Sequence, residues 1–162
     1  APGSRGAGMQ VSEVLRIKGS TLFTVTPDAM LSDGVMVMAD NDIGSLVVMD
    51  QGRLAGIVTF REVIKILAQR QREHRTGTTP PVAEIRIRDV MKKDPQIVSS
   101  QTEVTELRRQ MVESHQRYLP VMDGTTLLGV ISFHDVARAV LEEQGFENQM
   151  LKAYIRDWPS AG

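Results

Sequence analysis

The sequence predicts an α+β fold of two tandem β-α-β-β-α repeats that pack on each other, and three observations support it. Shifting the chain by 73 residues aligns its two halves without a gap, from Thr24/Ile97 to Ala68/Leu141. Ten aligned positions are identical, whereas average residue usage would give about three by chance. Each half shows the same order of helix, strand and turn signals, and each is too short to bury a good core alone.

The elements of the first repeat follow from local patterns. The hydroxyl and proline of Thr26-Pro27 predict a helix start. Its expected inward residues are Leu31, Val35, Met38 and Ala39. The β-branched runs 46–49 and 54–58 flank the turn Asp50-Gln51-Gly52-Arg53 and predict two strands of a hairpin. A second helix is expected from Phe60, and the side chains expected to face inward are Val63, Ile64, Ile66 and Leu67.

The second repeat shows the same elements. Ser99-Ser100 predicts a helix start, and the inward residues are expected to be Val104, Leu107, Met111 and Val112. Asp123-Gly124 supplies the turn of the second hairpin. The last helix is expected from Phe133, with inward residues Val136, Ala139 and Val140. A short segment precedes each repeat, at 11–17 and at 87–91.

These patterns divide the chain into five parts. We expect a tag remnant or disordered leader (1–10), a first repeat (11–70), a polar linker (71–86), a second repeat (87–144) and a helical tail (145–162). One face of the tail collects Phe146, Met150, Leu151, Tyr154, Ile155 and Trp158. Amphipathic helices usually bury this face within their own chain, which favours packing on the same module. A clasp across two subunits is the alternative.

Composition excludes several classes of protein. A net charge of -1 gives no bulk reason to bind nucleic acid or an anionic membrane surface. No run of about 18 apolar residues predicts a membrane span, and no signal peptide is visible. The absence of cysteine excludes disulfides and thiol catalysis. We therefore expect a cytoplasmic protein without nucleic-acid or membrane partners.

One pattern with chemical meaning recurs at the start of the last helix of each repeat. Thr59-x-x-Glu62 and Ser132-x-x-Asp135 each place a hydroxyl before the helix and a carboxylate three residues later. This is the spacing of a capping box, and spacing alone favours that interpretation. The same groups also suit a nucleotide, because a helix N-terminus attracts phosphate and a carboxylate accepts hydrogen bonds from ribose hydroxyls.

The residues resemble a known family at this point. The quoted motifs are Asp89-Val90-Met91, the glycine-to-helix segments 56–63 and 129–136, and the strand Arg117-Tyr118-Leu119-Pro120-Val121. Repeated in this order, they resemble a pair of cystathionine-β-synthase (CBS) domains over about residues 11 to 142. The resemblance implies a stand-alone regulatory protein in which the two repeats pack through their sheets. It also implies clefts that bind adenine nucleotides, and a disc-shaped homodimer.

The resemblance maps two nucleotide sites onto the chain, each completed by the opposite repeat. The Asp135 site, which we expect to be the surer one, comprises Ser132, Asp135 and His134 with Lys18, Gly19, Ser20, Thr21, Ile43, Gly44 and Ser45. The Glu62 site comprises Thr59, Glu62 and Arg61 with Lys92, Lys93, Pro95, Arg117, Tyr118 and Pro120. The family has an aspartate at the carboxylate position, and Glu62 is one methylene longer.

Enzymatic interpretations are weaker. Ser132, His134 and Asp135 have the residue types of a hydrolase triad, but neighbours on one helical turn point in different directions. The three histidines are too isolated to predict a metal site, and no phosphate-binding P-loop is present. We expect a non-enzymatic sensor of AMP, ATP or NAD that acts on an effector protein and uses no catalytic cofactor. The alternative is a structural or oligomerisation module with empty clefts.

Overall fold

The computed structural model describes residues 8–19, 21–76, 84–142, 153 and 156. In chain order, the elements are α2 (Val11–Lys18), β1 (Thr24–Val25), α3 (Leu31–Asn41), β2 (Ser45–Asp50), β3 (Arg53–Thr59), α4 (Phe60–Thr76), α5 (Ile87–Val90), β4 (Lys92–Lys93), α6 (Val104–Ser114), β5 (Tyr118–Asp123) and β6 (Thr126–Ser132). A last helix follows, of which residues 133–142 are described. The predicted α+β double repeat is confirmed.

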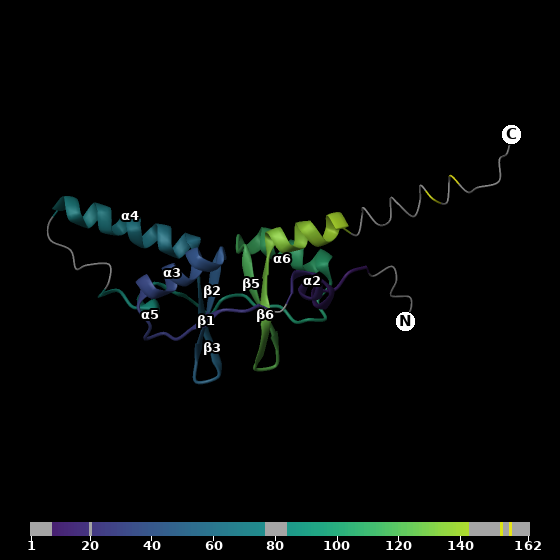
Figure 1. The fold of residues 1–162 in the computed structure, drawn as a ribbon, viewed down its shortest axis with the longest axis horizontal. Helices are drawn as coiled ribbons and strands as arrows, with labels where there is room; N and C mark the ends of the chain where they lie inside the picture. The colour runs from purple at the N-terminus through teal and green to yellow at the C-terminus, as the bar shows by residue number, and fades with distance from the viewer. Residues whose placement is uncertain (1–7, 20, 77–83, 143–152, 154–155, 157–162) are drawn as a thin grey trace.

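Two hairpins lie side by side at the centre of the molecule, one from each repeat (Figure 1). The sheet of the first repeat has the order β1-β2-β3-β4, with β1 parallel to β2 and the other pairs antiparallel. Hairpin β5-β6 forms the second sheet. The first strand expected in the second repeat is reduced to one parallel bridge, Val98 to Val121, which repeats the Val25 to Val48 pair of β1 and β2.

The turns of both hairpins follow the local sequence. Gln51 and Gly52 have positive φ values of 51° and 82°, as a type I′ turn requires of its two central residues. In the second hairpin Gly124 has a φ of 63° at the first central position, which suits a type II′ turn. The predicted hairpins are therefore confirmed.

The two repeats exchange their short leading segments. In the first repeat, Leu31 N donates to Ile85 O at 2.8 Å, and Ile87 N donates to Ala29 O at 2.9 Å. The second repeat has the matching bonds in reverse, from Val104 N to Met9 O at 2.9 Å and from Val11 N to Thr102 O at 2.8 Å. Each short helix, α2 or α5, is thus bonded to the repeat that it does not precede in the chain.

The hydrophobic cores follow the same exchange. One core contains Ile85 and Ile87 together with residues of the first repeat, namely Leu31, Val48 and Val58. The other contains Val11 and Val14 of α2 together with residues of the second repeat, including Val104, Leu107, Leu119 and Ile131. Neither repeat therefore has a complete core without the segment that precedes the other repeat in the chain.

This exchange corrects the predicted helix starts. Helix α3 begins at Leu31, not at Thr26-Pro27, and α6 begins at Val104, not at Ser99-Ser100. The physical reason is that the backbone before each helix bonds to the exchanged segment. The carbonyl of Pro27 accepts from Arg88 N, and that of Ser100 accepts from Ser12 N, both at 2.9 Å.

Five of the predicted inward residues are exposed in the structure, so those five predictions were wrong. Val35 and Ala39 of α3 and Val112 of α6 are exposed, whereas Leu31, Met38, Val104, Leu107 and Met111 are buried as expected. On α4, Val63 and Ile66 pack against the core, but Ile64 and Leu67 are 64% and 52% exposed. Apart from the small Ala39, these are large apolar side chains. Their helices carry more apolar residues than the core-facing stripe can hold, so some of them face solvent. In the last helix Val136, Ala139 and Val140 pack on the core, as predicted.

Several predictions concern residues that the structure does not describe. These are residues 1–7 of the leader, Ser20, residues 77–83 of the linker and the apolar tail residues between Phe146 and Trp158. Helix α4 reaches Thr76 and so extends into the predicted linker. Within the described residues, no helix combines the length and the hydropathy needed to cross a membrane.

Candidate functional site

The start of α4 is held by the hydroxyl and carboxylate that the sequence pattern singles out. Glu62 Oε1 accepts hydrogen bonds from Thr59 N at 2.7 Å and from Thr59 Oγ1 at 2.6 Å. The same hydroxyl oxygen accepts from Arg61 N at 3.1 Å. The pair therefore caps the helix and fixes one carboxylate oxygen of Glu62.

The equivalent pair in the second repeat caps its helix more symmetrically. Asp135 Oδ2 accepts from Ser132 N at 2.9 Å, and Ser132 Oγ accepts from Asp135 N at 3.0 Å. Ser132 is only 8% exposed. The capping interpretation of both patterns is confirmed, and it does not compete with ligand binding, because each carboxylate retains a second oxygen.

Strand register places each helix start beside the beginning of the neighbouring strand. Ser45 pairs with Thr59, and Tyr118 pairs with Ser132. In the same way, Gly44 O accepts from Phe60 N at 3.2 Å and Arg117 O accepts from Phe133 N at 2.9 Å. The two candidate sites are therefore built on the same backbone frame.

A lysine from the first repeat reaches the carboxylate of the second. Lys18 is the last residue of α2, and its Nζ lies 2.9 Å from Asp135 Oδ2 and also donates to Val130 O. The two side chains are 30% and 15% exposed. Helix α2 lies close to β6, as the short distance between Leu15 and Gly129 shows. A Cβ on Gly129 would lie 3.2 Å from Leu15 Cδ2. The predicted grouping of Lys18 with Asp135 is thus present in the structure.

Tyr118 lies where the two repeats meet. A Cβ placed on Gly44 would stand 2.0 Å from Tyr118 Oη, so only glycine leaves room for the phenol in this arrangement. Burial raises the pKa of the Tyr118 hydroxyl above its ordinary value, the charge of Asp135 adds to this, and Arg117 opposes it. The phenol is therefore close enough to Asp135 and Arg117 to sense both charges.

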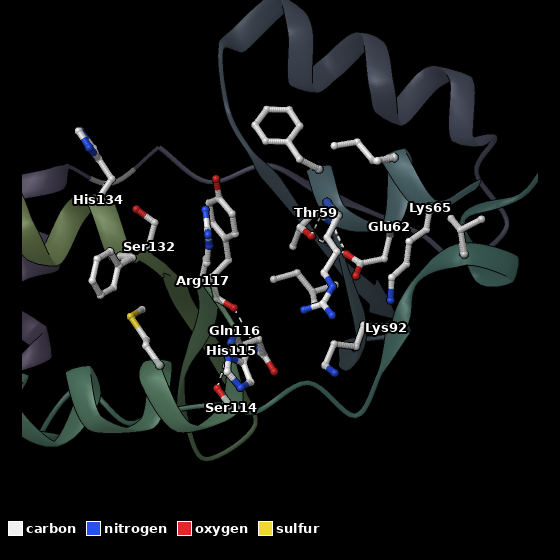
Figure 2. A pocket seen from close by; sticks show the side chains of 18 of the residues that line it. Thr59, Glu62, Lys65, Lys92, Ser114, His115, Gln116, Arg117, Ser132 and His134 are labelled. Carbon is white, nitrogen blue, oxygen red and sulfur yellow. Dashed lines mark hydrogen bonds between the residues drawn. The ribbon is translucent and has the colours of Figure 1, made fainter. Parts of the chain in front are cut away.

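An open cleft of about 1670 Å³ lies between the repeats (Figure 2). Its charged lining residues are Arg61, Lys65, Lys92 and Arg117 against Glu62 and Asp89. Its apolar wall includes Ile57, Phe60, Tyr118 and Phe133. Figure 2 shows Thr59, Glu62, Lys65 and Lys92 on one side of the cleft and Ser114 to Arg117 on the other. A cleft with excess positive charge and an aromatic wall suits an anionic ligand that carries a flat ring.

The cleft contains most of the Glu62 site and part of the Asp135 site. Its lining residues from the sequence expectation are Thr59, Arg61, Glu62, Lys92, Arg117, Tyr118, Ser132 and His134. The expected residues that do not line it are Lys18, Gly19, Thr21, Ile43, Gly44, Ser45, Lys93, Pro95, Pro120 and Asp135. Lys93 lies in β4 and pairs with Gly56, while Pro95 and Pro120 are buried.

Six polar lining residues were not among the expected site residues, namely Lys65, Gln69, Asp89, Ser114, His115 and Gln116. Lys65 lies one helical turn after Arg61, so its i,i+4 spacing was a usable signal. Asp89 caps α5 by accepting from Arg86 N, and α5 reaches the cleft only because the short helices are exchanged. Gln116 bonds to the backbone of Gln96 and Tyr118. No sequence pattern marked Asp89 or Gln116 as site residues.

Comparison with known proteins adds the family. The family model for the CBS domain matches residues 11–69 and 87–142. The chain belongs to the CBS-domain family. The CBS-domain protein CBSX3 of Arabidopsis thaliana, named as mitochondrial, is 31% identical over 157 residues, which cover 90% of this chain and 71% of that protein. The cytoplasmic location stays a prediction for this chain.

Solved CBS-domain structures share the fold. A protein from Burkholderia ambifaria, described as a signal-transduction protein with CBS domains, superposes with a TM-score of 0.72 at 29% identity, over 84% of this chain and 96% of that one. CBSX2, solved in complex with AMP, superposes with a TM-score of 0.67 at 23% identity, over 85% and 99%. The second likeness establishes the fold alone.

The described residues also bear on metal binding. Among them, no group of three or more His, Cys, Asp or Glu side chains is placed to hold a metal ion. His115 ends α6 with a φ of 59° and lines the cleft, as does His134 on the last helix. Their place in the cleft makes both imidazoles candidates for contact with a ligand.

Proposed function

We propose that this CBS pair is a regulatory module that binds an adenine nucleotide, namely AMP, ATP or NAD. The observation that carries the proposal is the cleft in which the capped start of α4 meets cationic side chains of the second repeat. The amides of a helix N-terminus and the positive end of its dipole favour phosphate, and Arg117 and Lys92 add full charges. Nothing comparable is needed in a purely structural interface.

The lining offers a separate partner to each part of a nucleotide. Arg117 provides a planar fork for phosphate oxygens, and Lys92 and Arg61 supply further positive charge. Glu62 Oε1 is engaged in capping, which leaves Oε2 for a ribose hydroxyl. Phe60 and Tyr118 supply aromatic surface for the base. CBSX2, which shares the fold, was solved with AMP, and this supports the choice of ligand class.

Regulation would follow from the position of the cleft. Its lining comes from both repeats, so a bound ligand bridges them and favours the arrangement in which both sets of contacts form. A change in that arrangement alters affinity for an effector protein only if the effector distinguishes the two states. The signal would be read by a partner, and the chain itself would catalyse nothing.

Calorimetric titration with AMP, ATP and NAD tests the proposal. We expect at least one of them to bind, and Arg117→Ala to weaken that binding about tenfold or more, since a lost charged hydrogen bond costs about 1.5–3 kcal/mol. Arg108→Ala is the matched control, because Arg108 is exposed on α6 and does not line the cleft. Absence of binding by all three nucleotides at millimolar concentration would refute the proposal.

We also propose a homodimer through the apolar stripe that α4 presents away from the core. Ile64 and Leu67 are exposed there, next to Phe60 of the cleft wall, and exposed apolar surface of this kind typically marks an interface. Leu67→Glu should therefore give a monomer in light scattering, whereas Gln71→Glu, one turn further along the same helix, should not. A Leu67→Glu protein that keeps its dimer would exclude this face.

A structural or oligomerisation module with empty clefts is the second candidate. The observation in its favour is that both hydroxyl–carboxylate pairs already act as helix caps. Such a module would lose stability on Asp135→Ala, which removes a helix cap, without any ligand effect. A melting-temperature screen separates the two candidates, because a ligand at 100 times its dissociation constant adds about 2.7 kcal/mol of stability.

A further inference from the structure

The carboxylates of the two repeats differ in what already occupies them. Asp135 Oδ2 accepts from Ser132 N and is also ion-paired with Lys18, in a contact where both side chains are largely covered. Glu62 Oε1 accepts only from the backbone and hydroxyl of Thr59. Among the described residues, Glu62 has no ion-pair partner at salt-bridge distance.

The difference arises from chain length before the first strand of each repeat. The exchanged backbone bonds make Val11 equivalent to Ile87, while Thr24 is equivalent to Ile97. The first repeat therefore has three more residues in this stretch, almost one helical turn. Helix α2 uses that length to reach Lys18, whereas α5 ends at Val90 and the chain continues as β4 along β3.

Breaking the Lys18 contact to admit a ribose would be costly. Asp135 and Glu62 each keep one oxygen free of the cap, but at Asp135 the ammonium of Lys18 already lies beside the carboxylate. Displacing Lys18 would leave a partly buried ammonium without its partner. The free-energy cost of that unpaired charge is larger than the stabilisation that an exposed ion pair provides. Tyr118 adds to the obstruction, because its hydroxyl lies against Gly44, in the strand entrance expected to hold the base.

The electrostatics of the two regions point the same way. Lys18 neutralises Asp135, so this side offers no excess positive charge to a phosphate. The open cleft is lined by Arg61, Lys65, Lys92 and Arg117 against two carboxylates. An anionic ligand is therefore attracted to the cleft and gains nothing at Asp135.

We infer that Lys18 is an internal occupant of the Asp135 site, and that the chain binds one phosphate-bearing nucleotide, in the Glu62 cleft only. This inference rests on the proposed function and assigns the ligand to one of its two sites. It reverses the order of the sites that the sequence favoured. Lys18 is then the residue that sets the number of ligands per chain.

Titration calorimetry with ATP and AMP on the full chain tests this assignment. The wild type should bind one nucleotide per chain, and Glu62→Gln, which preserves a capping oxygen, should weaken that event about tenfold. Lys18→Met should add a second binding event while the first keeps its affinity. Lys18→Gln serves as a second variant if Lys18→Met does not fold. Arg16→Met removes a charge from the exposed side of the same helix and should leave one event.

The failures of the two proposals are distinguishable. Binding that is lost in Asp135→Ala and unchanged in Glu62→Gln would overturn the site assignment and leave the nucleotide function standing. A wild type with two events, or folded Lys18 variants with only one, would overturn the role of Lys18. Absence of any binding by the wild type and all variants would refute the nucleotide function and this inference together.

Discussion

The hydroxyl of Tyr118 lies against the backbone of Gly44 in the opposite repeat, so closely that a Cβ on Gly44 would stand 2.0 Å from it. In the repeat alignment, Tyr118 is equivalent to Ser45, the residue that follows Gly44, and Gly44 is equivalent to Arg117. A small residue on one side thus makes room for a large one on the other. The contact between Gly44 and Tyr118 therefore joins the start of β2 in the first repeat to the start of β5 in the second.

Gly44→Ala should therefore displace Tyr118 and lower the free energy of unfolding. Overpacking of this kind typically costs about 1–3 kcal/mol, and the lower end is expected because the phenol is the mobile end of its side chain. The φ of Gly44 is not positive, so the backbone itself tolerates alanine. Urea denaturation of the variant and the wild type measures the difference.

The matched control combines Gly44→Ala with Tyr118→Ala. Once the phenol is absent, the added methyl group should cost little, so the two substitutions should be non-additive by about 1 kcal/mol. Strict additivity in this double-mutant cycle would show that the contact does not govern stability.

The sequence predicted the hairpins and the helix caps because both depend on residues only a few positions apart. Turn chemistry at Gly52 and Gly124 and the three-residue spacing of Thr59 and Glu62 act locally. The exchange of α2 and α5 depends on pairing between segments about 55 to 95 residues apart. A repeat alignment does not show which of the two repeats such a segment packs against. The sequence placed Lys18 and Asp135 in the same predicted site but did not predict their ion pair, because residue spacing carries no information about contacts between distant segments.

The exchange of core residues predicts an asymmetric response to substitution at two isoleucines. Ile87 is fully buried in the core of the first repeat, so Ile87→Ala should cost about 2–5 kcal/mol of unfolding free energy. Ile97→Ala removes the same atoms from a side chain that is 45% exposed and should cost about 0.5 kcal/mol or less. Chemical denaturation compares them, and equal costs would contradict the exchanged core.

The buried cap at Ser132 predicts a stability effect that is independent of any ligand. Ser132→Ala removes the oxygen that accepts the hydrogen bond from Asp135 N and should lower the unfolding free energy by about 0.5–2 kcal/mol. Ser132→Thr keeps the hydroxyl and should retain most of the stability. Thermal denaturation without nucleotide measures both variants. A loss seen only when nucleotide is present would assign Ser132 to binding alone.

The raised pKa of Tyr118 predicts a pH dependence with a defined sign. Burial is the larger cause and the charge of Asp135 the next, and both favour the neutral phenol in the folded state. In a Tyr154→Phe background, where Tyr118 is the remaining tyrosine, tyrosinate absorbance should appear at a higher pH than in the unfolded chain. Asp135→Asn should lower this pKa, and Arg117→Gln should raise it further, because the two charges act in opposite directions.

The same shift contributes to stability. A group whose pKa is raised on folding binds its proton more tightly in the native state, so its contribution is complete below the unfolded pKa of about 10. That contribution is lost as the pH rises through the folded pKa. The unfolding free energy should therefore fall above about pH 10 and fall less steeply in Tyr118→Phe, which has no proton to lose. Identical alkaline slopes for the two proteins, measured by urea denaturation, would mean that the phenol is not perturbed by its place between the repeats.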